Sequence, residues 1–224
     1  MMTLERKICL PPYKLAYSFC FVLVLSLVRG VSFTCEIGVA MEAPMAVLAI
    51  VFCADTYTQE IVSKRSEVHR LYPVKNRLRS MAARMAVQQG ALILLSAIGY
   101  GLFFLFQNPP SLYQPGESPE TEWEMFLMFL AAMIVTLCFW GSLSNLLSCL
   151  FRNMWAGIEC CIAVWLVTNS LFGDQVLGDW NVFSYTFRNI ADSRDVHWLY
   201  GKVLCLVLCA AMAFLMPKII RKRG

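Results

Sequence analysis

Charged residues are scarce in this sequence, and long apolar runs stand in their place. Asp, Glu, Lys and Arg together make up only 15% of the 224 residues, whereas 58% are hydrophobic. An ordinary soluble domain has about a quarter of its residues charged. The imbalance excludes a soluble globular protein and predicts an all-α membrane protein, because each helical crossing of a bilayer needs roughly 20 mainly apolar residues.

Signatures of nucleotide binding and catalysis are also missing. The chain has no G-x-x-x-x-G-K-[ST] loop and no soluble region that would house one, so energy from ATP would have to come from another subunit. Histidine occurs only at His69 and His197, and the apolar runs contain no paired acids for hydrolytic chemistry. We therefore expect a chain that is not itself an enzyme, with no catalytic and no cofactor-binding residues.

Ten cysteines are present, but their positions argue against a disulfide framework and against a metal centre. Eight of them fall inside apolar runs, where cysteine packs as a small hydrophobe. Cys205 and Cys209 share one helix face, a spacing that suits a soft metal ion, yet that run contains no histidine or carboxylate. We expect no bound metal.

An intramembrane serine protease would need a serine and a histidine in contact. The stretch "WGSLSN" offers Ser142 and Ser144, but Leu143 and Asn145 follow them where rhomboid proteases carry glycine. His197 is expected at the outer edge of the last span and both serines toward the inner half. Base and nucleophile would then not meet within about 3 Å, which disfavours this alternative.

The apolar runs predict six transmembrane helices in a single domain over residues 1–224. The expected spans are 15–33, 37–54, 85–106, 125–150, 154–172 and 198–216. The first resembles a signal peptide in outline, but no small-residue cleavage pattern follows it, so we expect a retained helix. The second is the weakest, because it contains Pro44 and has Glu36 and Glu42 around its outer end. Pro44 would fall in the first turns, where a missing backbone donor is tolerated.

Basic residues gather on one side of these predicted spans. With the N-terminus inside, fifteen of the nineteen Lys and Arg residues lie on the inner side. The outer side receives Arg29, Arg188, Arg194 and Lys202, together with ten of the fifteen acids. Cytoplasmic connections are enriched in Lys and Arg. We therefore expect an even number of crossings of the cytoplasmic (plasma) membrane, with both termini in the cytoplasm.

The outer segment 173–197 mixes aromatic with charged residues. Such a composition is typical of the membrane interface, where aromatic rings lie at the depth of the headgroups. We expect this placement for five aromatic side chains: Trp180, Phe183, Tyr185, Phe187 and Trp198.

The cytoplasmic segment 55–84 is the most basic part of the chain and has a helical pattern. Its apolar residues recur at spacings of three, four and seven, and Pro73 is expected to break the helix. Two interpretations compete. The segment is either an ordinary positive-inside loop that holds lipid headgroups, or a coupling helix that docks a cytoplasmic partner.

The order of residues in this segment favours docking. A polar "ADTYTQE" leaves the second span with an acid at Glu60, a basic amphipathic stretch follows, and "LYPVKNRLRSMAARM" re-enters the membrane. This order resembles the permease subunits of type-2 ATP-binding-cassette exporters, although "SKRSE" stands where that family has a glycine-threonine pair. The stretch "GSLSNLLSCLFRNMWAGIECCIAVW" is similar to the family's fourth and fifth spans, joined by a tight turn at Arg152 and Asn153.

The resemblance implies a transmembrane half of an ATP-driven bacterial exporter for an amphipathic peptide, lipid or lipophilic drug. Its partners would be a nucleotide-binding ATPase subunit that holds ATP and Mg, a second permease subunit, identical or related, and membrane lipids, with no nucleic acid. The ATPase would dock on Glu60, Lys64, Arg65, Glu67, Arg70 and Tyr72.

Polar residues within the spans are the other candidates for function, because ionisable groups in a membrane are costly and often functional. Glu159 either reaches the interface and pairs with a base such as Arg152, or faces the bundle interior as a coupling or substrate-path residue. Asn145 and Asn169 would join helices by hydrogen bonds. A membrane anchor or assembly protein that transports nothing predicts the same topology and stays an alternative.

Overall fold

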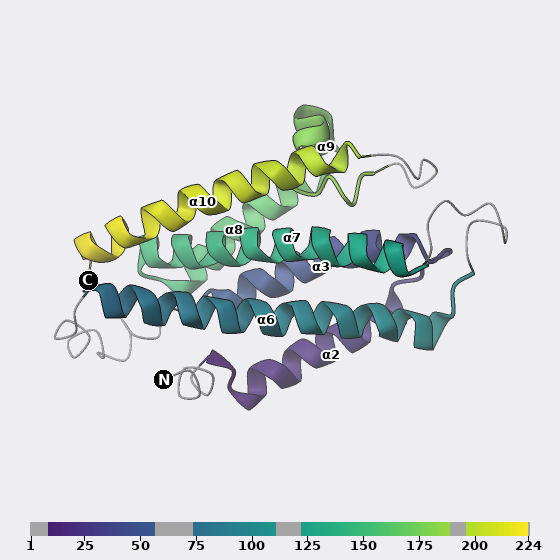
Figure 1. The fold of residues 1–224 in the computed structure, drawn as a ribbon, viewed down its shortest axis with the longest axis horizontal. Helices are drawn as coiled ribbons and strands as arrows, with labels where there is room; N and C mark the ends of the chain where they lie inside the picture. The colour runs from purple at the N-terminus through teal and green to yellow at the C-terminus, as the bar shows by residue number, and fades with distance from the viewer. Residues whose placement is uncertain (1–8, 57–73, 111–121, 189–195, 224) are drawn as a thin grey trace.

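The computed structural model describes residues 9–56, 74–110, 122–188 and 196–223, and within these ranges every regular element is a helix. Figure 1 shows the long helices running side by side along one axis. In chain order the elements are α2 (Pro12–Val28), α3 (Glu36–Cys53), α6 (Val74–Gln107), α7 (Glu122–Phe151), α8 (Met154–Thr168), α9 (Leu171–Leu177), the short 3-10 helix η1 (Gly178–Trp180) and α10 (Trp198–Arg223).

Four of these helices, α3, α6, α7 and α10, are long and apolar enough to cross a bilayer. A fifth crossing exists if α8 and the α9–η1 unit, which meet at a bend of 73°, form one broken span. The apolar helix α2 is shorter, with 17 residues. Four to five candidate spans in an all-helical fold indicate a membrane protein, while the six-span topology and its orientation stay predictions.

The helix ends follow local chemistry. Helix α6 is described from Val74 onward, and the predicted break at Pro73 lies outside the described residues. It runs unbroken to Gln107, so the last part of the predicted coupling segment is continuous with the third span. The side chain of Gln107 in turn donates to the carbonyls of Ser26 (2.7 Å) and Arg29 (2.8 Å). These bonds provide partners for backbone carbonyls at the C-terminal end of α2, which have none within the helix. Helix α2 ends at Val28 rather than at the predicted Phe33.

The second predicted span, expected to be the weakest, forms α3, which is long and apolar enough to cross a bilayer and is the most buried of the four candidate spans. In α3, 72% of the residues are buried inside the bundle, against 22% in the span of α10. Helix α3 contacts α2, α6, α7 and α8, and Figure 1 shows it behind α6 and α7. Small buried residues let these neighbours approach closely, and they are Gly38, Ala40, Ala43, Ala46 and Ala49.

Pro44 lies deeper in α3 than the sequence indicated. The helix begins at Glu36, so the proline sits in its interior, about two turns from the start. Its ring removes one backbone donor from the helix. Beside it, the indole Nε1 of Trp165 in α8 donates to the carbonyl of Ala43 at 3.0 Å, which ties α8 to this part of α3.

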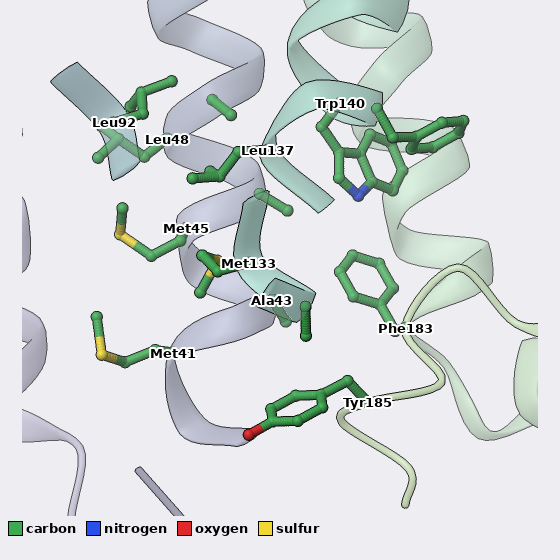
Figure 2. Close-up of a cluster of buried hydrophobic side chains, with 14 of the residues drawn as sticks. Met41, Ala43, Met45, Leu48, Leu92, Met133, Leu137, Trp140, Phe183 and Tyr185 are labelled. Atoms are coloured by element: carbon green, nitrogen blue, oxygen red, sulfur yellow. The ribbon is translucent and has the colours of Figure 1, made fainter. Parts of the chain in front are cut away.

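Most of the aromatic side chains predicted to lie at headgroup depth in the membrane interface pack against other parts of the protein, while their depth in the membrane stays a prediction. Phe183, Tyr185 and Trp198 are buried. Phe183 stacks on Trp140 of α7 at 5.6 Å between ring centroids, and Tyr185 meets Trp198 edge to face at 5.3 Å. Figure 2 shows Phe183 and Tyr185 among core side chains of α3 and α7. Of the five predicted aromatics only Trp180 is largely exposed.

The inward fold of this segment begins where α8 ends early, at Thr168 rather than at the predicted Phe172. Ser170 then caps α9, accepting a hydrogen bond from the backbone N–H of Gly173 at 3.1 Å. After η1, Asn181 donates from Nδ2 to the Thr168 carbonyl at 3.0 Å, and Ser184 donates to the Trp198 carbonyl at 2.7 Å. Residues 181–188, which we call the inserted segment, therefore lie between the end of α8 and the start of α10.

Replacement of Gly157 by alanine is expected to destabilise the bundle. A Cβ there would lie 2.6 Å from the backbone nitrogen of Ser148 and 2.7 Å from its Cα, so α7 and α8 would have to separate. Overpacking of this kind costs about 1–3 kcal/mol, more than the roughly 1 kcal/mol of helix propensity that alanine gains over glycine. Thermal unfolding of the purified protein in detergent measures the difference.

The matched control is Gly90→Ala in α6, where a Cβ meets nothing within 4 Å. This variant should melt at the wild-type temperature or slightly above it. Equal melting temperatures for the two variants would contradict the close packing of α7 on α8.

Candidate functional site: two buried ion pairs

Two ion pairs lie inside the bundle, one near each end of α3. Glu42 of α3 pairs with Lys202 of α10, and Lys14 of α2 pairs with Asp55 just beyond the end of α3. All four side chains belong to buried residues. Charges are rarely buried in a membrane protein unless they are paired and carry a function, so these pairs are the strongest candidates for a functional site among the described residues.

The Glu42 carboxylate is fully enclosed, with 1% of the residue exposed. One oxygen, Oε1, accepts hydrogen bonds from Lys202 Nζ and, at 2.8 Å, from the Thr136 hydroxyl. The other oxygen, Oε2, accepts from the Thr186 hydroxyl at 2.6 Å. Both carboxylate oxygens are therefore engaged by donors from three different segments of the chain.

The Lys202 ammonium is equally saturated. Its Nζ donates to Glu42, to the Thr136 hydroxyl oxygen at 2.8 Å and to the Val182 carbonyl at 2.9 Å. An ammonium has three protons, so each one has an acceptor. Thr136 bridges the two charges, because its hydroxyl oxygen accepts a hydrogen bond from Lys202 and its hydroxyl proton is donated to the Glu42 carboxylate.

This network joins parts of the chain that are far apart in sequence. Glu42 belongs to α3, Thr136 to the middle of α7, Lys202 to the first turns of α10, and Val182 and Thr186 to the inserted segment. The ion pair therefore fastens the inserted segment to three helices, α3, α7 and α10. None of these elements can shift without leaving a charge or a buried acceptor unpaired.

The second pair fastens the opposite end of α3. Lys14 Nζ donates to Asp55 Oδ1 at 2.5 Å and to the Phe52 carbonyl at 3.0 Å. One residue further along, the Thr56 hydroxyl donates to Gln88 Oε1 of α6 at 2.6 Å. Helices α2, α3 and α6 are thus joined at the point where the chain leaves α3 toward the predicted docking segment.

A buried cysteine lies directly before α3. Cys35, directly before α3, is buried, and this burial together with the nearby Glu36 carboxylate raises the pKa of its thiol. A thiol is a nucleophile or a metal ligand only when it is deprotonated.

Arg188 Nη2 donates to the Cys35 carbonyl at 3.3 Å, and its guanidinium lies 4.4 Å from the centre of the Tyr185 ring. This arrangement holds the inserted segment against the start of α3.

The predicted intramembrane candidates lie in different surroundings. Glu159 is exposed on α8 and does not face the interior of the described bundle. Asn169 caps the end of α8, where its backbone N–H reaches the carbonyls of Trp165 and Val167. Asn145 is buried on α7, and its Nδ2 lies 3.2 Å from the sulfur of Met85.

The predicted docking residues, Glu60, Lys64, Arg65, Glu67, Arg70 and Tyr72, lie outside the described residues.

The residues considered for a protease are far from the geometry that such chemistry needs. The Ser144 hydroxyl donates to the Ile50 carbonyl of α3 at 2.6 Å. His197 is exposed just before α10, with Nδ1 at 3.4 Å from Asp179. Serine and histidine therefore occupy different parts of the bundle.

Sequence reasoning missed the Glu42–Lys202 site because it placed both residues near the outer ends of spans. A signal was available. Glu42 lies inside the pattern "VAMEAPMAV", and Lys202 lies four residues into an apolar run. Two opposite charges in different spans at comparable depth are a reason to test a buried pair.

Removal of one charge from the pair should cost more than removal of both. Glu42→Gln or Lys202→Met leaves one buried charge uncompensated, and the expected loss is about 3–5 kcal/mol of the unfolding free energy. The double variant Glu42→Gln/Lys202→Met should regain at least half of that loss. Denaturant titration in mixed micelles measures this cycle. Additive losses would show that the two groups do not interact.

Comparison with known proteins assigns no family to this chain. No protein-family model matches it, and neither a curated protein nor a solved structure does. The functional argument therefore depends on the buried charges and on the residue pattern of segment 55–84, which is predicted to be cytoplasmic.

Proposed function

We propose that this chain is the transmembrane permease half of an ATP-driven exporter, which moves an amphipathic substrate across the cytoplasmic membrane. The observation that carries the proposal is the saturated Glu42–Lys202 pair, buried where α3, α7, α10 and the inserted segment meet. The resemblance of residues 55–84 to the cytoplasmic segment of exporter permeases supports it.

Buried charges distinguish a transporter from a passive anchor. An anchor needs only apolar spans, and a buried ion pair is weak as a source of stability because desolvation offsets the attraction between the charges. A transporter needs elements that exchange one packed arrangement for another. A pair that holds several segments together in one state and releases them in another meets that need.

Helix α3 is suited to carry motion between the two ends. It has 18 residues, which corresponds to a rod about 27 Å long. At one end, Lys14 and Asp55 join it to α2 just before the predicted docking segment. Toward the other end, Glu42 holds Lys202 and the inserted segment. In this proposal, ATP-driven movement at the docking segment displaces α3 and opens the outer end of the bundle.

The remaining parts of the proposal come from the same resemblance. The ATPase subunit supplies ATP and Mg, a second permease subunit completes the path, and lipids surround both. The N-in and C-in orientation follows from the distribution of basic residues.

Purification of the tagged chain in mild detergent should bring down a nucleotide-binding subunit with ATPase activity. Glu60→Lys and Arg65→Glu, in the predicted docking segment, should each lower the ATPase activity that accompanies the chain about tenfold. They should leave its melting temperature unchanged. Arg221→Glu is the matched control, a charge reversal in a basic stretch outside the docking segment, and should have no effect. Purification without any ATPase would favour the anchor.

Transport by the double variant Glu42→Gln/Lys202→Met separates a mechanical role of the pair from a purely structural one. The variant should keep its ATPase partner and regain stability, as expected for a matched removal of both charges. Its substrate export from vesicles should nevertheless fall at least tenfold. In this proposal, separation of the Glu42 and Lys202 charges releases the inserted segment, and the double variant has no charges to separate. Normal export by a stable double variant would show that the pair only holds the fold.

A further inference from the structure

A cavity of about 390 Å³ lies at the end of the bundle opposite the Glu42–Lys202 pair. It lies between the first turns of α6, the second half of α7 and the last turns of α10. Figure 1 shows α7 between α6 and α10 at this end. The lining residues are Met81, Ala82, Met85, Ser142, Asn145, Cys209, Met212, Ala213, Met216 and Pro217.

The lining is apolar and adaptable. Four of the ten lining residues are methionines, whose unbranched thioether side chains adjust to ligands of different shape. The volume falls within the roughly 300–1,000 Å³ typical of small-molecule pockets. Ala82 of α6 and Ala213 of α10 are exposed members of the lining. The lining therefore reaches the surface of the bundle at these two residues.

One polar group in the lining lacks a partner. Asn145 is 1% exposed, and its Oδ1 accepts no hydrogen bond from any described residue. Its Nδ2 has only the Met85 sulfur, at 3.2 Å, which is a weak acceptor. An unpaired buried acceptor is costly. A ligand with an O–H or N–H group would satisfy it.

Charge near the cavity restricts the ligand further. None of the lining residues is acidic. The exposed residues Arg79 and Lys218 lie within two positions of Met81 and Met216 in the sequence. Such surroundings disfavour a cationic ligand, since like charges repel at short range.

We propose that this cavity binds an uncharged lipophilic molecule through its apolar body, with a hydroxyl or amide N–H that donates to Asn145 Oδ1. The binding site stands independently of ATP. Its use as the site where the exported substrate enters rests on the proposed function.

Three photoreactive probes test the proposal on the purified full-length chain in lipid nanodiscs. They are a diazirine-bearing decanol, the matching decane without the hydroxyl, and the matching decylamine, which is cationic at neutral pH. Mass spectrometry locates the labelled residues. We expect the alcohol to label Met81, Met85 or Met212 at least fivefold more than the alkane or the amine does, because only the alcohol is a neutral donor.

Variants connect the labelling to the cavity. Ala213→Phe fills the opening and should lower alcohol labelling of the lining at least fivefold, whereas Ala211→Phe, at an exposed position on another face of α10, should not. Asn145→Leu removes the acceptor and should lower alcohol labelling about tenfold, which corresponds to the loss of one hydrogen bond. Alkane labelling should change less than twofold.

Equal labelling by the three probes in the wild-type protein would overturn the proposal without any need for a variant. Labelling spread evenly over the exposed faces of α8 and α10 would overturn it as well. The labelling experiment contains neither ATP nor a partner subunit, so its outcome does not depend on the exporter proposal. If the chain copurifies with no ATPase but the alcohol still labels the lining specifically, the exporter proposal fails and the binding cavity is supported.

Discussion

The burial of a single carboxylate, that of Glu42, sets the arrangement of one end of the bundle. A carboxylate in a membrane interior is tolerated only when a cation and hydrogen-bond donors replace the water it has lost. Lys202 and the hydroxyls of Thr136 and Thr186 provide that replacement. Because these donors come from α7, α10 and the inserted segment, satisfaction of one charge fixes three separate parts of the chain against α3.

The opposite end of α3 is fixed by the same principle with different partners. Lys14 and Asp55 bind α2 to α3, and Thr56 with Gln88 binds α3 to α6. Between these ends the small residues of α3 allow close packing on every side. In the proposed exporter, a helix fastened in this way near both ends would shift as one rigid element. This property is what makes α3 the natural link between a cytoplasmic motor and an outer gate in the proposed exporter.

The two polar sites of the bundle differ in whether their hydrogen-bonding groups already have partners within the described chain. The Glu42–Lys202 site has donors and acceptors in balance, so it has no capacity left for a ligand and acts on the fold itself. Asn145 has an unpaired oxygen beside a methionine-lined cavity, so it has capacity for a donor from outside the chain. Gating and binding would accordingly reside at different levels of α7, in its middle and in its second half, and a change at one would reach the other through that helix and its neighbours.

The sequence by itself determined the helical membrane character, the approximate limits of most helices and the turn at Arg152, because these depend on local apolar runs and backbone rules. It did not determine which span lies at the centre, since hydropathy does not distinguish a lipid neighbour from a protein neighbour. Only the tertiary structure decided that Glu42 meets Lys202, 160 residues away, and that the aromatic outer segment turns inward. Both outcomes depend on long-range packing, in which a charge or a ring is stable only where several distant segments together exclude water from it.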